Sequence, residues 1–144
     1  YPSDKDTVAT DMALTHTWET IAREYWEDVS DGQLLFGLVQ GGMFPDLREE
    51  SASVLTALDF PGYAIGGLSV GEPIDELERM TTVTAAFLPR EKPRYLMGVG
   101  LPKNMHHAIH AGIDMFDCVA PTRLARHGHF FSEDGHLNIR NQRF

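Results

Sequence analysis

The sequence contains a single cysteine, Cys118, among 144 residues. One cysteine excludes an internal disulfide framework and a cysteine-rich zinc site, and it fits a reducing compartment. Long hydrophobic runs are also missing, because no stretch approaches the roughly 20 apolar residues that a membrane-spanning helix needs. The polar first residues lack the apolar segment of a signal peptide. These absences predict a cytoplasmic protein without a membrane partner.

Motifs for phosphate binding and for zinc-dependent proteolysis are absent as well. The glycine-rich segment 66–71 lacks the GxGxxG spacing, and GxxxxGK[ST] does not occur. His106 and His110 have the i, i+4 spacing of metal ligands on a helix, but without HExxH they fit a solvated helix face better. The sequence therefore argues against an unrelated nucleotide-binding domain and predicts no metal site within the chain.

Positive charge is scarce, with 12 lysines and arginines against 21 acidic residues and a formal net charge of −9. This balance argues against a general nucleic-acid binder. Residues 121–144 differ, because they hold four arginines and two acidic residues, a net charge of +2. That segment is compatible with contacts to a few phosphates, although a solvated tail is the simpler interpretation.

What the sequence does contain is an alternation of apolar runs and amphipathic segments. Runs typical of strands buried on both faces occur at 34–39, 63–67, 95–99 and 114–119. Helical periodicity occurs at 4–28, 46–58, 74–88 and 102–111. A C-terminal hairpin is predicted from 129–131 and 137–139, with a turn at 132–135.

This order predicts an α/β fold in one domain, residues 1–144, with about four parallel strand–helix units. Four such units are about half of a (β/α)8 TIM barrel. A small doubly wound sheet is the alternative.

In either architecture, functional residues gather at the carboxyl ends of the strands. Here those ends carry Gln40, Gly66–Gly67, Met97 and Asp117. An amide donor and acceptor, two glycines that permit close approach, a soft apolar side chain and a carboxylate suit a planar nitrogen heterocycle. Each residue type also has a purely structural explanation, as a turn glycine, a core methionine or a capping amide.

Asp117 is the most informative of these residues, because it lies in the apolar run 115–119 and a proline follows at 121. A buried carboxylate needs a partner. A structural ion pair with Arg123 would supply one. The alternative is a nucleophile or base at the rim of a barrel. Both hypotheses stay open, because a perturbed carboxylate does not always mark a functional site.

Five segments resemble the bacterial tRNA-guanine transglycosylases, also called queuine tRNA-ribosyltransferases. They are FGLVQG at 36–41, GGLSVGE at 66–72, YLMGVG at 95–100, DMFDCVAPTR at 114–123 and NIRN at 138–141. The resemblance covers nearly the whole chain. It implies part of a TIM barrel from an enzyme that exchanges guanine at the tRNA wobble position for a 7-deazaguanine base in queuosine biosynthesis.

The resemblance also implies residue roles. Asp117 matches the covalent nucleophile, which attacks the ribose C1′ in a double displacement. The matching base-binding positions are Gln40, Gly66, Gly67, Leu68, Val70, Glu72, Met97 and Gly98. Valine at position 70 suggests preQ1, 7-aminomethyl-7-deazaguanine, as the incoming base. Arg123 and Arg126 match positions that contact the anticodon loop of a tRNA with a GUN anticodon.

Other features of the family have no match in this sequence. The two upstream aspartates, one acting in acid/base chemistry and one recognising the base, are missing. So is the downstream zinc site, although Zn²⁺ and a homodimer are expected of full-length family members. The sequence also does not begin with methionine. We therefore predict a C-terminal-half barrel fragment that is catalytically incomplete alone. A non-catalytic, tRNA-binding partner subunit is the alternative.

Overall fold

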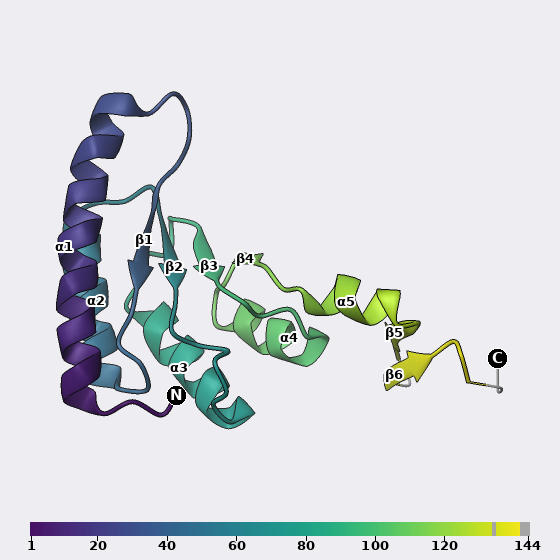
Figure 1. Cartoon of the computed structure of the whole chain (residues 1–144). Helices are drawn as coiled ribbons and strands as arrows, with labels where there is room; N and C mark the ends of the chain where they lie inside the picture. Colours follow the sequence, from purple (N-terminus) through teal and green to yellow (C-terminus); the bar gives the residue numbers. More distant parts are fainter. Residues whose placement is uncertain (134, 142–144) are drawn as a thin grey trace.

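A computed structural model describes residues 1–133 and 135–141 and has a four-stranded parallel sheet at its centre (Figure 1). The strands are β1 (Phe36–Val39), β2 (Gly62–Ile65), β3 (Arg94–Leu96) and β4 (Met115–Phe116). The helices are α1 (Lys5–Val29), α2 (Pro45–Ala57), α3 (Ile74–Ala86), α4 (Pro102–His110) and α5 (Ala120–Arg126). The predicted α/β class and the parallel strand–helix units are confirmed.

The order of the strands decides between the two predicted architectures. The strands lie in the sequential order β1-β2-β3-β4, and the helices follow the same order, with α2 packed between α1 and α3, and α3 between α2 and α4. A doubly wound sheet would reverse its strand order at a switch point. Sequential winding with neighbouring helices is the arrangement of a (β/α)8 barrel, and this chain forms part of one.

The core lies between the sheet and this helical layer. Val39, Ile65 and Leu96 are paired across β1, β2 and β3, and all three are completely buried. Leu55 of α2 and Met80 of α3 belong to the same buried cluster. Burial of each such side chain stabilises the fold by about 1.5–3 kcal/mol. Because successive strand residues face opposite sides, the residues that follow this row face away from the helices.

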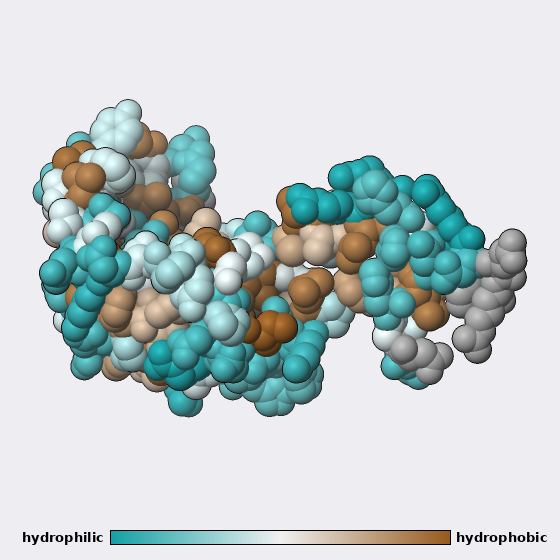
Figure 2. Space-filling model, turned by 60° about the horizontal axis from the view of Figure 1, so that its bottom comes forward, coloured by the Kyte–Doolittle hydropathy of each residue, from teal (hydrophilic) through white to brown (hydrophobic). Residues whose placement is uncertain are grey.

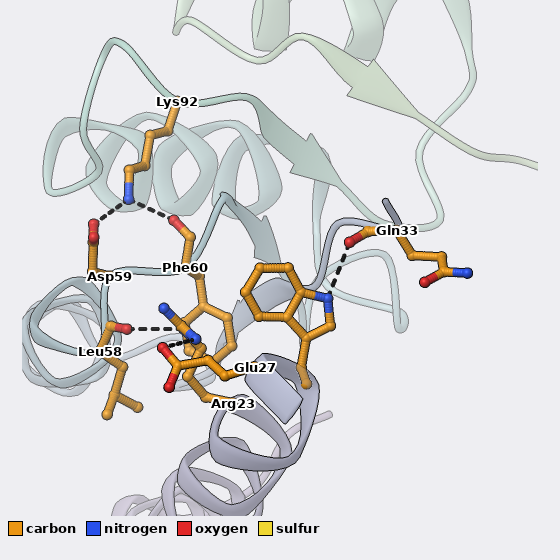
Figure 3. Close-up of polar contacts among 8 residues, drawn as sticks. Arg23, Glu27, Gln33, Leu58, Asp59, Phe60 and Lys92 are labelled. Atoms are coloured by element: carbon orange, nitrogen blue, oxygen red, sulfur yellow. Dashed lines mark hydrogen bonds and ion pairs between the residues drawn. The ribbon is translucent and has the colours of Figure 1, made fainter. Parts of the chain in front are cut away.

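Polar contacts tie together the loops that precede the strands (Figure 3). Arg23 of α1 donates to the Leu58 carbonyl at 3.2 Å, and its guanidinium lies over the Phe60 ring. Lys92, just before β3, pairs with Asp59 and donates to the Phe60 carbonyl at 2.6 Å. These contacts stabilise the end of the sheet where the strands begin. The candidate site lies at the other end, where the strands finish.

Helix α1 carries the predicted apolar stripe, but most of it faces solvent. Met12 is buried, whereas Leu14, Trp18, Ile21 and Tyr25 are between 49% and 67% exposed. The helix begins where predicted, because the Asp4 side chain accepts a hydrogen bond from the Thr7 amide at 2.9 Å. The periodicity therefore predicted the helix correctly, but it did not predict which residues of the stripe are buried, because that depends on tertiary packing.

The C-terminal part forms an arm that projects from the body (Figures 1 and 2). It consists of α5 and an antiparallel hairpin, β5 (His129–Ser132) and β6 (Gly135–Asn138). The predicted hairpin is confirmed, although Asp134 of its turn lies outside the described residues. Hydrophobic atoms reach the surface along the arm and where it leaves the body (Figure 2).

One expectation about this region was wrong, and one helix was missed. The fourth strand does not extend over 114–119 but contains only Met115 and Phe116. Helix α5, which the sequence did not predict, begins one residue after Val119. Pro121 occupies the first turn of this helix, where a proline is tolerated, and lies five residues beyond the end of β4.

Candidate active site

The residues expected at the strand ends form one row across the sheet. The pairing registers are Val39 with Ile65, Ile65 with Leu96, and Leu96 with Phe116. Continued by one residue, the same registers align Gln40, Gly66, Met97 and Asp117. The ladder does continue, because the Gly66 amide donates to Val39 and the Met97 amide to Ile65. The four residues therefore share the sheet face opposite the helical layer.

Asp117 is exposed, not buried as its apolar run had suggested, and two donors rather than an arginine contact it. The Tyr95 hydroxyl donates to its Oδ1 at 2.6 Å, and the Gly98 amide donates to the same oxygen at 2.7 Å. The Gly98 amide first, and the Tyr95 hydroxyl second, hold the pKa of the Asp117 carboxyl below its usual range. No ion pair joins Asp117 to Arg123 within the described part of the chain, so the structural ion-pair hypothesis is wrong.

Tyr95 is a site residue that reasoning from the sequence missed. It lies two residues before Met97 on β3, so both side chains face the same side of the sheet. Hydrogen bonding to Asp117 raises the pKa of the Tyr95 hydroxyl. The sequence did contain a signal for Tyr95, because a residue two positions before Met97 faces the same side of the sheet. Its contact with Asp117, however, depends on the pairing of β3 with β4, which the sequence does not show.

Tyr95→Phe is expected to raise the pKa of Asp117 toward its usual value. The substitution removes one of two donors that favour the ionised carboxylate, so protonation will occur at a higher pH than in the parent chain. The measurement is an NMR titration of the Asp117 carboxyl carbon. Tyr25→Phe, on the exposed side of α1, is the control and should leave the midpoint unchanged. Equal midpoints in the parent and in Tyr95→Phe would contradict the expectation.

Gln40 follows β1, and its backbone is held by Ser51 of α2. The backbone N–H of Gln40 donates to the Ser51 hydroxyl at 3.2 Å, and the same hydroxyl lies 3.0 Å from His16 Nε2. Its side-chain amide packs against the glycine pair after β2, because a Cβ on Gly67 would lie 2.8 Å from Gln40 Oε1. Glycine at position 67 therefore leaves room for the amide of Gln40.

The loop after β2 is shaped by Glu72. This carboxylate accepts hydrogen bonds from the Ser69 amide and, at 2.9 Å, from the Val70 amide. Ser69 has a positive φ of 61°, an uncommon conformation that the two hydrogen bonds support. The Leu68 side chain is buried in the core, so only its backbone is available to a ligand. Ser69 also donates to the Gly98 carbonyl at 3.0 Å, which joins this loop to the residues around Asp117.

A cavity of about 520 Å³ opens beside this row. Gln40, Gly67 and Val70 line it, together with apolar residues that were not predicted at the site, among them Met12 and Phe44. Met97 and Asp117 are not among the lining residues, so the cavity covers the amide end of the row and the carboxylate lies outside it. Its apolar walls with few polar groups are typical of a small-molecule site.

Beneath the loops lies Arg48, whose side chain is fully buried. Its Nε donates to the Gly42 carbonyl at 2.7 Å and its Nη2 donates to the Gly66 carbonyl at 3.1 Å. Burial lowers the pKa of Arg48 to about 10, while the Glu72 carboxylate acts in the opposite direction. The guanidinium therefore remains charged at neutral pH.

The family model for queuine tRNA-ribosyltransferase matches residues 1–144. The chain belongs to the queuine tRNA-ribosyltransferase family. A protein of that name from Leptothrix cholodnii is 52% identical over 132 residues, 92% of this chain and 34% of the relative. Similar proteins from Azoarcus sp. and Oleidesulfovibrio alaskensis are 50% and 49% identical over 98% and 100% of this chain, and it covers 38% of each. The chain thus spans little more than a third of these relatives.

The two arginines expected to contact tRNA lie on the arm. Arg123 and Arg126 belong to α5, where both are exposed. Among residues 1–133 and 135–141, no group of three metal-ligating side chains is close enough to hold an ion. No helix among the described residues is long and apolar enough to cross a membrane. The predicted roles of the site residues remain predictions.

Proposed function

We propose that this chain carries the nucleophile and base-reading part of a tRNA-guanine transglycosylase site. The observation that carries the proposal is Asp117, whose carboxylate accepts hydrogen bonds from Tyr95 and Gly98 and is aligned with Gln40 across the sheet. In the proposed reaction, the bond between ribose C1′ and guanine N9 breaks as an Asp117 oxygen bonds to C1′. The leaving guanine takes the bond's electron pair and a proton from the upstream acid/base aspartate expected of the full-length family. The incoming base then displaces Asp117 and returns its N9 proton to that aspartate.

The geometry distinguishes the two carboxylate oxygens. Oδ1 accepts both hydrogen bonds, from Tyr95 and Gly98, whereas no described residue donates to Oδ2. We assign the attack to Oδ2, because its lone pairs are not engaged. A carboxylate suits this step, since its charge stabilises an oxocarbenium-like transition state before the bond forms.

Base recognition is assigned to the cavity end of the row. Gln40, the Gly67 amide and the Leu68 carbonyl would bind the base edge, and Met97 would pack on its face, with Gly66 and Gly98 permitting close approach. Val70 lines the cavity and is 56% exposed, so its branched side chain limits the room for a large base. This supports preQ1 rather than a bulkier base as the incoming substrate.

The wider assembly is also proposed from family membership. Arg123 and Arg126 are free to contact phosphates of a GUN anticodon loop, since neither forms an ion pair within the described residues. A homodimer, structural Zn²⁺ and a cytoplasmic location are proposed for the full-length protein. The second candidate function is tRNA binding without turnover, and it is favoured by one observation. Among the described residues, no other carboxylate contributes to the pKa shift of Asp117.

The test is a covalent trap. The chain is mixed with an anticodon stem-loop RNA and a guanine analogue, denatured, and examined for a protein–RNA band that survives denaturation. A band would establish that this chain forms the ribosyl intermediate. Its absence from a chain shown to be folded by circular dichroism would refute self-sufficiency and leave RNA binding as the function to be measured.

A further inference from the structure

Arg48 is the largest fully buried side chain in the structure and carries a charge. A buried guanidinium is costly unless it is hydrogen-bonded, because water no longer solvates it. Here two of its three nitrogens donate to backbone carbonyls, and Nη1 has no partner among the described residues. The position of Arg48 beneath the loops that carry Gln40 and Gly67 suggests a function for this buried charge.

The two carbonyls belong to different loops. Gly42 lies in the loop after β1, two residues after Gln40, and Gly66 lies directly after β2. A planar guanidinium has donors in a rigid fork, so a single arginine fixes two acceptors relative to each other. The absence of a side chain at Gly41 permits this approach, because a Cβ there would lie 2.8 Å from Arg48 Cγ. Arg48 thereby ties the Gln40 loop to the Gly66–Gly67 loop.

The bond to Gly66 also sets the direction of the next amide. In a trans peptide the carbonyl and the following N–H point to opposite sides. Because Arg48 holds the Gly66 carbonyl from beneath, the Gly67 N–H points away from Arg48. No described residue accepts a hydrogen bond from this N–H, and Gly67 lines the cavity. The amide is therefore available as a donor to a ligand.

We infer that Arg48 is a positioning residue for base recognition, which presents the Gly67 N–H to an acceptor oxygen of the bound base. This inference rests on the proposed function. Glu72 has the complementary task, because it holds the Ser69 N–H and so turns the Leu68 carbonyl the other way. Arg48 and Glu72 thus orient two peptide groups, 66–67 and 68–69, in opposite directions. The first presents a donor, the Gly67 N–H, and the second an acceptor, the Leu68 carbonyl.

The test compares guanine affinity in matched variants of the whole chain. Arg48→Met removes both donors and is expected to weaken guanine binding about tenfold. Arg48→Lys is expected to weaken it about threefold, since an ammonium lacks the planar fork. Arg94→Lys is the control, because Arg94 is also buried and donates to the Leu88 and Pro89 carbonyls, outside the candidate site. It should leave guanine affinity unchanged.

A second measurement needs no ligand. The residual dipolar coupling of the Gly67 N–H reports its direction in the free chain, and it should change in Arg48→Met and partly recover in Arg48→Lys. An unchanged coupling in the Arg48 variants, or equal losses of guanine affinity in Arg48→Lys and Arg94→Lys, would overturn the inference. If the parent chain fails to bind guanine, the proposed base reading is wrong for this chain, and the coupling still decides the role of Arg48. If Arg48→Met does not fold, Arg48→Lys decides both measurements.

Discussion

Asp117→Asn is expected to abolish any covalent protein–RNA band that the parent chain forms. Asparagine has nearly the same shape and still offers an oxygen to the Tyr95 hydroxyl and the Gly98 amide. It lacks the negative charge and the nucleophilic lone pairs of the carboxylate, and removal of a nucleophile typically lowers rates by about 10³-fold or more. The fold should therefore persist while bond formation stops. The measurement is the yield of the denaturation-resistant band over time.

Asp114→Asn is the matched control for this experiment. Asp114 precedes the same strand, is also exposed, and accepts a hydrogen bond from the Arg94 amide at 2.9 Å, which an asparagine oxygen can replace. Its band should form at the parent rate. A band of equal strength in Asp117→Asn would show that another group forms the bond, whereas loss of the band in both variants would point to a general effect of charge on RNA binding.

Gly41→Ala is expected to destabilise the chain by about 3–5 kcal/mol, a large share of the total stability of an ordinary domain. Gly41 has a φ of 130°, which residues with a side chain rarely adopt. A Cβ there would also lie 2.7 Å from the Arg48 backbone nitrogen and 2.9 Å from the Leu47 carbonyl carbon. Backbone atoms of a helix cannot move aside as a flexible side chain can. Urea unfolding followed by circular dichroism measures the loss.

Gly71→Ala separates backbone strain from the steric clash. Gly71 has a φ of 112°, but a Cβ there meets no atom within 4 Å. The variant should lose only the strain contribution, about 1–2 kcal/mol. If both alanine variants unfold at the same urea concentration, the contact with Arg48 and Leu47 contributes nothing, and the tight loop after β1 is more adaptable than its geometry indicates.

Much of the fold was predictable because its signals are local. Short apolar runs indicate buried parallel strands, and each of the four runs overlaps a strand of the structure. Strand ends were less certain, since the run 114–119 continues past β4 into the loop that holds Asp117 and the start of α5. Helix α5 was missed because Pro121 is compatible both with the end of a strand and with the first turn of a helix.

The sequence alone determined the alternation of strands and helices, the hairpin, and the residue types that end each strand, because these depend on composition and spacing along the chain. Sequential winding, the common row of Gln40, Gly66, Met97 and Asp117, and the contact of Tyr95 with Asp117 were decided by tertiary structure. The same holds for Arg48 beneath the glycine loops. The physical reason is that strand registers and buried charges are set by partners distant in sequence, and no local pattern records which partner will be adjacent.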